Sequence, residues 1–425
     1  MAITNLTVSN FKSFKHLDLA LGRFNVVIGA NASGKSNFVE TFRFLRTIEQ
    51  NGLDDAISLH GGRDAVLNKR LGPSEPLRIR ATSDRQMAWP GGQANVQVHE
   101  TTYDFTLQFG GSQNGTLIKD DHFIQEYRIK NAIGDIEETK LDISVSEGKP
   151  TVKIDPSDID ARIKKSLLKD PVSHEFYLHL KNVWGLVEMR RMAGLLINSY
   201  LWGLVMEQRE GLFRRIAVYD IDPHAVKKPH ETAGIPRLQE TGENLALVLK
   251  QILGDPEKSR MFHNLLRDIL SFAVEIGTEQ YVGTSILLKL REKYYEDALL
   301  ANLLSDGTVD IAALITALYF EDKDVVIIEE PERNIHPHLI SRLVGMMKDA
   351  SRKKKDASRE KQVIVTTHSP EIVRHAGVEN LLLLTRDKDG FSTISRPADK
   401  EEVRVFLEND LGLDEVFIQE LWGMQ

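Results

Sequence analysis

The sequence predicts an α/β fold: a mixed, mostly parallel sheet with helices, an antiparallel β section and a mainly helical insertion. Three observations lead to this fold class. An apolar strand, a glycine-rich loop and an amphipathic helix follow one another in residues 24–50. Strand and helix patterns alternate again after residue 300, as they do in parallel sheets with helical crossovers. Between these parts, residues 77–152 alternate with period two, and residues 158–270 repeat mostly at helical spacing.

The N-terminal segment predicts a β-hairpin that leads into a buried strand. Residues 3–20 alternate between polar and apolar side chains, whereas residues 24–28 form a nearly continuous apolar run. A helix is expected from Lys35 to Gln50. Its apolar side chains recur at helical spacing, at Phe38, Phe42 and Leu45.

The last third of the chain predicts two further strands with helices between them. In chain order we expect a helix at 310–319, a strand at 325–328, a helix at 337–350 and a strand at 362–366. The chain is long for one compact core, so we expect several parts. They are an N-terminal lobe at residues 1–155, a mainly helical insertion at 156–295 and a C-terminal lobe at 296–425.

Composition excludes several classes of protein. The chain has 425 residues, a net charge of -8 and no cysteine, which excludes disulfides, zinc–cysteine sites and thiol catalysis and fits a reducing compartment. The negative net charge gives the whole molecule no general attraction to nucleic acid. No apolar run approaches the roughly 18 residues of a membrane span, and no secretory signal begins the chain. We therefore expect a cytoplasmic protein with no membrane partner.

A phosphate-binding loop stands between the first buried strand and the first helix. Residues 29–36 read Gly-Ala-Asn-Ala-Ser-Gly-Lys-Ser, which is a complete G-x-x-x-x-G-K-S motif in its required context. Glycines let successive backbone N–H groups turn toward phosphate oxygens, and the helix N-terminus adds positive partial charge. Lys35 is expected to neutralise the β- and γ-phosphates of ATP, and the Ser36 hydroxyl is expected to ligate Mg²⁺.

Two carboxylates end the strand predicted at 325–328. Glu329 and Glu330 follow the apolar run Val-Val-Ile-Ile, and ligands of such sheets bind at the carboxyl ends of the strands. Neighbouring residues of a strand point to opposite sides, so we expect one acid in the metal shell and the other polarising the attacking water. The alternative is a pair of solvated acids.

Two weaker signals complete the set. His368 ends the next predicted strand, where it could contact the γ-phosphate or the attacking water, although most single histidines are structural. Residues 305–308 read Ser-Asp-Gly-Thr at the start of an apolar helix. A serine there caps a helix in the plainer interpretation, and Gly307 permits close approach of an anion in the functional one.

In this order, the segments resemble the Walker A, signature, Walker B and H-loop of an ABC-type ATPase. Together with residues 10–14 (Asn-Phe-Lys-Ser-Phe) and 335–337 (Ile-His-Pro), they resemble the RecF/SMC-like ATPases, most of all the OLD-like stand-alone AAA-family ATPases without a nuclease domain. The resemblance covers the first fifty residues and residues 300–372. It implies a homodimer that closes head to head on two ATP molecules.

The resemblance also implies roles for particular residues. Glu330 is the expected catalytic base, His368 the γ-phosphate sensor, and Ser36 and Glu329 the Mg²⁺ shell. Ser305 and Gly307 would contact the γ-phosphate of the partner subunit's nucleotide. The remaining nucleotide contacts are expected at Gly29, Asn31, Ser33, Gly34, Lys35 and Asn37.

The sequence departs from the usual family pattern at several positions. Glu329 replaces the usual aspartate, the signature is Ser-Asp-Gly-Thr instead of Ser-Gly-Gly-Gln, and the following loop contains Glu332 and Asn334. The glutamine that senses Mg²⁺ is not assigned and remains open among Gln108, Gln113 and Gln125. The segment after Pro370 is short for a nuclease domain, and residues 158–300 lack the sustained heptads of coiled-coil arms.

Three functions are therefore compared. The first is an ATPase that switches a dimer and controls an effector protein or a DNA-associated process, in genome maintenance or anti-phage defence. The second is a nucleotide-dependent binding module with negligible hydrolysis, and the third, a transporter subunit, is disfavoured by Ile335-His336-Pro337. DNA binding by Arg190-Arg191 and Arg214-Arg215, or by the basic run 352–355, is an alternative to ordinary salt bridges and a solvated loop.

Overall fold

The computed structural model divides the chain into two compact units. It describes residues 1–84, 87–88, 96–110, 115–130, 136–146, 149–155, 211–234, 237–352 and 360–399. The β-rich unit comprises Met1–Gly22, Ser36–Arg215 and Arg386–Ile394. The core unit comprises Arg23–Lys35, Ile216–Thr385 and Ser395–Gln425. Each unit thus combines segments that are far apart in the sequence.

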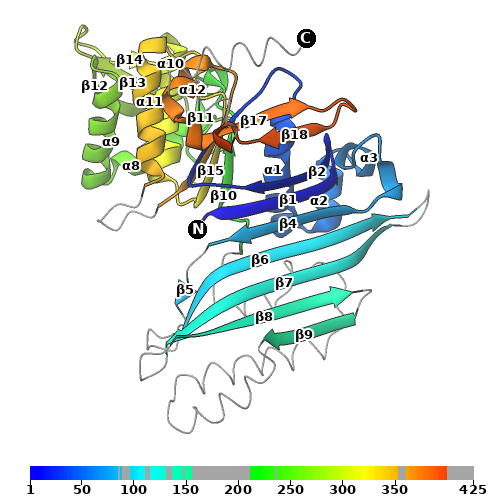
Figure 1. Ribbon diagram of the computed structural model, residues 1–425. Helices are drawn as coiled ribbons and strands as arrows, with labels where there is room; N and C mark the ends of the chain where they lie inside the picture. Colours follow the sequence, from blue (N-terminus) through cyan, green and yellow to red (C-terminus); the bar gives the residue numbers. More distant parts are fainter. Residues whose placement is uncertain are drawn as a thin grey trace. The chain divides into compact units, whose positions relative to one another are not determined.

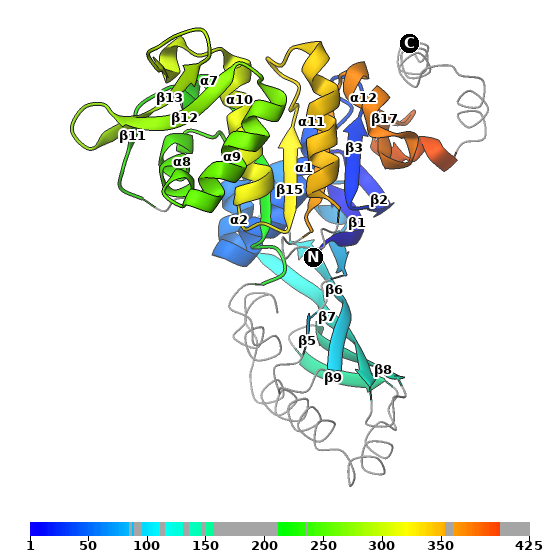
Figure 2. The ribbon, with the colours of Figure 1, turned by 90° about the vertical axis from the view of Figure 1, so that its left-hand side faces the viewer.

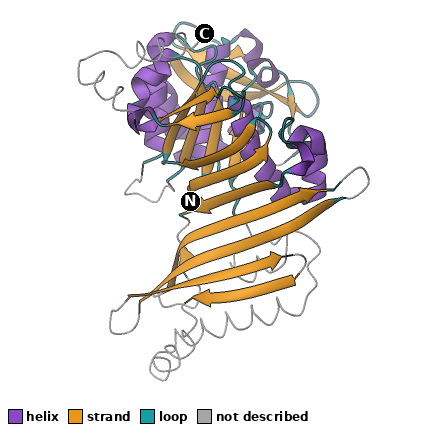
Figure 3. Ribbon diagram, turned by 45° about the vertical axis from the view of Figure 1, so that its right-hand side comes forward, coloured by secondary structure: helices purple, strands orange, loops and turns teal. Residues whose placement is uncertain are grey.

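An antiparallel sheet dominates the β-rich unit. Its strands are ordered β2-β1-β4-β6-β7-β8-β9, with the short β5 beside β6. Figure 1 and Figure 3 show the long strands side by side. The bounds are β1 Ile3–Phe11, β2 Phe14–Ala20, β4 Leu77–Ser83, β5 Met87–Ala88, β6 Val96–Phe109, β7 Thr116–Lys130, β8 Ile136–Ser146 and β9 Lys149–Asp155.

Helix α1, Lys35–Asn51, supplies aromatic side chains to the core of this unit. Phe38, Phe42 and Phe44 are fully buried, and the Phe44 ring lies 5.5 Å from that of Phe11 on β1. Such pairs of aromatic rings add to the stability gained from burial alone. The short helices α2 Leu53–Leu59, α3 Arg63–Val66 and η1 Gly72–Ser74 follow.

A mostly parallel sheet forms the centre of the core unit. Its order is β10-β15-β16-β3-β17-β18, with parallel pairing from β10 through to β17. The strands in the core unit are β3 Phe24–Ile28, β10 Ile216–Tyr219, β15 Val325–Glu329, β16 Gln362–Thr367 and β17 Leu381–Arg386. Strand β18, Ser392–Ser395, ends the sheet order and falls almost entirely in the segment Arg386–Ile394. Every residue of β3 and β16 is buried, as expected for parallel strands covered on both faces.

Helices and a second small sheet surround this centre. Figure 2 shows α9, α10 and α11 gathered beside β15. The helices are α7 Pro223–Val226, α8 Leu245–Leu253, α9 Pro256–Ile269, α10 Asp306–Ile315, α11 Pro337–Ala350 and α12 Pro370–Ala376, with a π-helical continuation of α10 at Thr316–Phe320 and short 3₁₀ turns at Ala301–Leu303, Val378–Asn380 and Pro397–Asp399. The small sheet contains β11 His230–Glu231, β12 Ala273–Gln280, β13 Ser285–Glu292 and β14 Leu299–Leu300.

The predicted α/β fold class is confirmed, and so are most of its elements. The hairpin, the first helix, the antiparallel section and the alternating elements of the last third occur where the patterns placed them. The helix expected at 310–319 begins earlier, at Asp306, because Ser305 caps it.

The expected helical insertion needs a correction in its described part. Residues 156–210 lie outside the described residues. Between 211 and 295 the chain forms strands β10, β12 and β13 as well as helices, and β10 pairs with β15 in the central sheet. The four residues of β10 are all apolar and buried, and so short an apolar run has no period that distinguishes a strand from a helix.

Candidate active site

The phosphate-binding loop connects β3 to α1 in a tightly turned conformation. Ala32 and Gly34 have left-handed backbone angles, with φ of 63° and 118°, and the Ser33 N–H donates to the Ala30 carbonyl at 3.1 Å. A Cβ at Gly29 would lie 2.4 Å from the Leu384 carbonyl oxygen, so this position requires glycine. Turns of this kind direct backbone N–H groups into one concavity that suits an anion.

Lys35 begins α1 and bonds back to the loop. Its Nζ donates to the carbonyl oxygens of Gly29 at 2.7 Å and Ala30 at 3.2 Å. Burial lowers the pKa of Lys35, while the negative charges of Glu330 and Glu332 act in the opposite direction. The Lys35 ammonium group therefore donates hydrogen bonds to the loop and is attracted by the negative charges of the two acids that follow β15. Ser36 and Asn37 are the next residues of α1.

The register of the central sheet brings three strand ends together. Glu329 on β15 is paired with Thr366 on β16, and Thr367 is paired with Ile28 at the end of β3. The phosphate-binding loop, the acidic pair and the histidine segment therefore leave the sheet at one edge, as the sequence predicted.

Glu330 leaves the strand in a strained conformation. Its φ is 45°, which is uncommon outside glycine, and its N–H donates to the Thr366 carbonyl at 2.8 Å. Its carboxylate accepts a hydrogen bond from Arg333 Nη2 at 3.0 Å and contacts His368 Nδ1 at 3.1 Å. The structure thus joins the two residues predicted to be catalytic.

The electrostatic surroundings keep Glu330 ionised. Burial acts to raise its pKa, but the hydrogen bond from Arg333 and the charges of His368 and Arg333 together outweigh it. The pKa of Glu330 therefore lies below its ordinary value. A carboxylate that is ionised at neutral pH can accept a proton from water.

Glu332 is a site residue to which the sequence gave no catalytic role. Its Oε1 accepts a hydrogen bond from Thr367 Oγ1 at 2.5 Å, while its buried Oε2 has no hydrogen-bond partner. Burial raises the pKa of this carboxyl. The sequence pattern Glu-Glu-Pro-Glu contained the signal, because Glu329 ends β15, Glu330 follows it and a third acid comes two residues later.

The signature segment caps a helix. Ser305 Oγ accepts from the Thr308 N–H at 3.2 Å and bonds to Thr308 Oγ1 at 2.7 Å, an arrangement worth about 1 kcal/mol to a helix. A Cβ at Gly307 would lie 2.5 Å from the Asn334 carbonyl oxygen, so the helix start packs directly on the loop that follows β15. Within the part of the chain that the structure describes, no hydrogen bond joins Ser305 or Gly307 to the phosphate-binding loop.

A buried acid connects this helix to the same loop. Asp310 is 4% exposed, and its Oδ2 accepts from Asn334 Nδ2 at 3.1 Å. Its Oδ1 is buried without a hydrogen-bond partner. Burial is the main cause that raises the pKa of Asp310 to about 7.

Replacing Asp310 with asparagine should stabilise the protein in a pH-dependent way. Because the pKa of this carboxyl is raised on folding from 3.8 to about 7, the folded state binds the proton more tightly, and stability falls as pH rises through that interval. The full penalty, about 3–4 kcal/mol, applies above pH 7. Thermal unfolding at pH 8 should occur roughly 5 °C higher in Asp310→Asn, with a clearly smaller difference at pH 5, which lies inside the interval between the two pKa values. A shift of the same size at both pH values, or an equal effect of the exposed control Asp349→Asn, would contradict this assignment.

The glutamine candidates remain open. Gln108 Nε2 donates to the Pro73 carbonyl at 2.9 Å. Gln125 is buried and accepts from the Tyr127 hydroxyl at 2.5 Å. Gln113 lies outside the described residues.

The structure describes only one of the two arginine pairs considered for DNA binding. Arg214 Nε lies 3.7 Å from the Glu49 carboxylate, and Arg215 is only 5% exposed. This pair therefore fits the salt-bridge interpretation better than a contact with DNA. Arg190-Arg191 and most of the basic run 352–355 lie outside the described residues.

A basic cavity of about 310 Å³ lies within the β-rich unit. Among the described residues that line it none is acidic, while Lys12, Lys69, Arg70 and Arg386 are cationic. Phe391 also lines it, with Arg70 at 5.5 Å from the ring centre. Asn37 of α1 is part of the same lining. Cations beside an aromatic ring suit an anionic ligand that has a planar group. Local sequence patterns missed this cavity because its residues come from distant parts of the chain.

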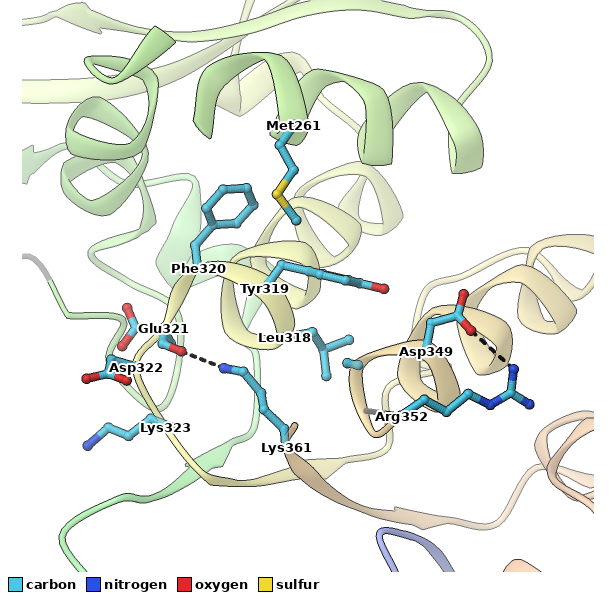
Figure 4. Close-up of a pocket in the computed structure, with 11 residues that line it drawn as sticks. Met261, Leu318, Tyr319, Phe320, Glu321, Asp322, Lys323, Asp349, Arg352 and Lys361 are labelled. Atoms are coloured by element: carbon cyan, nitrogen blue, oxygen red, sulfur yellow. Dashed lines mark hydrogen bonds and ion pairs between the residues drawn. The ribbon is translucent and has the colours of Figure 1, made fainter. Parts of the chain in front are cut away.

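A second cavity, of about 240 Å³, lies in the core unit. Figure 4 shows Tyr319 and Phe320 of the π-helical segment, Met261 of α9, and Lys361 just before β16. Lys361 Nζ donates to the carbonyl oxygens of Ala317 and Glu321, and Tyr319 donates to that of Met346. None of the predicted site residues lines this cavity.

The site residues fit Mg²⁺ bound together with a nucleotide. Among the described residues, no group of three or more His, Cys, Asp or Glu side chains is placed to hold a metal ion. Mg²⁺ in phosphate-transfer sites takes one or two protein oxygens and obtains the rest from phosphates and water. A serine hydroxyl at Ser36 and a strand-end carboxylate at Glu329 are such a partial set.

This fold is that of the ABC-type P-loop ATPases. Residues 1–181 match the family model described as "AAA ATPase domain", and residues 209–374 match the one described as "AAA domain, putative AbiEii toxin, Type IV TA system". The chain is 34% identical over 117 residues to "DNA replication and repair protein RecF" of Desulforudis audaxviator (strain MP104C). These matches confirm the predicted resemblance to the RecF/SMC-like ABC-type ATPases.

The extent of these similarities differs. The RecF match covers 25% of this chain and 32% of that protein, so the chain spans about a third of its relative's length. A solved SMC head bound to the C-winged helix domain of ScpA has 14% identity and a TM-score of 0.48, covering 93% of this chain and 98% of that one. The SMC head domain from Thermotoga maritima has 13% identity and a TM-score of 0.43, with 93% and 99% covered.

Proposed function

We propose that this protein binds ATP with Mg²⁺ and hydrolyses it. The observation that best supports this function is the joined pair Glu330–His368 at the edge of the sheet from which the phosphate-binding loop leaves. A loop alone binds phosphate, whereas an ionised carboxylate beside a histidine at the same edge can also act on water.

Each residue has a proposed role. Lys35 offsets the charge of the β- and γ-phosphates, and the N–H groups of the loop bind their oxygens. Glu330 accepts a proton from the attacking water. As it does so, the water oxygen bonds to the γ-phosphorus, and the bond between the γ-phosphorus and the β–γ bridging oxygen breaks. His368 orients Glu330 and contacts the γ-phosphate. Mg²⁺ held by Ser36 and Glu329 would neutralise charge on the phosphate oxygens.

The test of hydrolysis is phosphate release by the purified protein. We expect ATP-dependent release that stops when EDTA removes Mg²⁺, because the phosphate charge is then no longer offset. Release should return when Mg²⁺ is restored. Light scattering with and without ATP reports the dimer in the same samples. A dimer that forms with ATP and releases no phosphate would contradict hydrolysis and support the alternative of a binding module.

That alternative rests on two positions. Glu329 is longer by one methylene than the usual aspartate, and the signature reads Ser-Asp-Gly-Thr. Both changes would weaken the closed, hydrolytic dimer. In the leading proposal, by contrast, Ser305 and Gly307 complete the nucleotide site of the partner subunit.

The process that ATP controls is proposed more broadly. The relative's name supports a role in DNA replication or repair, and the toxin description of the second family model supports a role in defence. We propose an ATP-switched dimer that controls an effector protein or a DNA-bound assembly in the cytoplasm. Within the described chain, no helix has the length and apolar character needed to cross a membrane. Binding to duplex DNA that requires ATP and weakens with salt would support the DNA branch.

A further inference from the structure

Arg333 connects two carboxylates at the edge of the central sheet. Its Nη2 donates to Glu330 Oε2 at 3.0 Å, and its Nη1 donates to Asp220 Oδ1 at 3.1 Å. Asp220 directly follows β10, the strand that pairs with β15. The guanidinium group is therefore held between the ends of two neighbouring strands.

This arrangement occupies both oxygens of the proposed base. Arg333 binds Oε2 of Glu330, and His368 Nδ1 lies 3.1 Å from Oε1. The Glu330 side chain is 28% exposed, so without these partners it would be free to change rotamer. Two contacts on opposite oxygens restrict it to one orientation.

The backbone brings Arg333 to this position. Glu330 has a φ of 45°, and the Arg333 N–H donates to the Glu330 carbonyl at 3.0 Å, which closes a tight turn. Strained residues of this kind persist where the surrounding contacts fix them, and they gather at functional sites. The turn returns the chain so that Arg333 faces the carboxylate three residues earlier.

We propose that Arg333 is a positioning residue for hydrolysis, which fixes the carboxylate of Glu330 and is itself oriented by Asp220. The inference rests on the proposed hydrolytic function. Arg333 acts through Glu330 and has no contact with the nucleotide in this role. Its planar guanidinium suits the task, because it presents several donors in a fixed geometry and can bind two carboxylates at once.

The test compares four variants by steady-state ATP hydrolysis. In Arg333→Ala we expect kcat to fall roughly 10- to 100-fold, as it does when supporting contacts of a site are removed, with KM within about twofold of the wild type. Arg333→Lys should recover part of the loss, because an ammonium can reach one carboxylate but not both. Asp220→Asn should lower kcat less than Arg333→Ala. The matched control is Arg291→Ala, which removes an ion pair of 3.0 Å to Glu275 on β12.

The outcomes distinguish a failure of the role proposed for Arg333 from a failure of the proposed hydrolytic function. An active wild type with unchanged or faster turnover in Arg333→Ala would overturn the role of Arg333, since the ion pair would then be idle or would withhold Glu330 from water. A raised KM with unchanged kcat would also overturn it, by showing that Arg333 contacts the nucleotide. A wild type without turnover would overturn the hydrolytic function and this inference together.

Discussion

Replacing Glu330 with glutamine is expected to lower the rate of ATP hydrolysis by about 10²–10³-fold and to leave ATP binding intact. The amide has nearly the shape of the carboxylate, and its oxygen can still accept from Arg333 or His368. It cannot accept a proton from water. Because the phosphate-binding loop and Lys35 are unchanged, the phosphates should still bind.

Single-turnover hydrolysis and equilibrium binding of ATP measure the two effects separately. Glu371→Gln provides the control, because Glu371 is an acid on α12 with a side chain that is 41% exposed. Turnover near the wild-type rate in Glu330→Gln would remove Glu330 as the base. Glu332, whose buried Oε2 has no hydrogen-bond partner, would then be the next residue to test.

The sequence predicted the parts of the site that depend on contiguous residues. The loop from Gly29 to Ser36 is defined by its own spacing, the strand before it is a nearly continuous apolar run, and the helix after it has apolar side chains at helical spacing. Strands β15 and β16 were equally clear, because each contains a continuous apolar run, Val-Val-Ile-Ile in β15 and Val-Ile-Val in β16, as is typical of parallel central strands. Their neighbouring positions in the sheet then brought Glu330 and His368 to one edge.

The geometry of the acidic pair followed from a different cause than expected. Alternation along a strand was the reason for giving Glu329 and Glu330 different roles. In the structure β15 ends at Glu329, and Glu330 has turned into the left-handed region, with φ at 45°. The separation of the two acids therefore arises from the strand end, which depends on the hydrogen bond to Thr366 and is not visible in the pattern.

Contacts between distant segments could not be predicted. Asp220 reaches Arg333 because β10 is the outermost strand of the central sheet and pairs with β15. A strand of only four residues has too little pattern to be identified from the sequence. The basic cavity joins Lys12, Arg70 and Phe391, which no local motif connects. Both features require the fold before their charges can be seen to converge.

Replacing Lys35 with alanine is expected to weaken ATP binding by about 10²–10³-fold. Hydrogen bonds to charged groups contribute about 1.5–3 kcal/mol each, and Lys35 is proposed to contact two phosphates. The ammonium lies beside Glu330 and Glu332, whose negative charges influence its pKa. Without it, those acids would repel the triphosphate, so the loss should exceed that of a simple contact.

Titration calorimetry with a slowly hydrolysed ATP analogue would measure this effect, with Lys348→Ala as the matched control. Lys348 also donates its Nζ to a backbone carbonyl, that of His375, at 2.9 Å. Removing it should leave affinity unchanged. If Lys35→Ala bound the analogue as the wild type does, the phosphates would not lie in this loop. If instead affinity fell only slightly and the difference from the wild type disappeared in high salt, Lys35 would contribute general attraction and no direct phosphate contact, because salt screens the first more than the second.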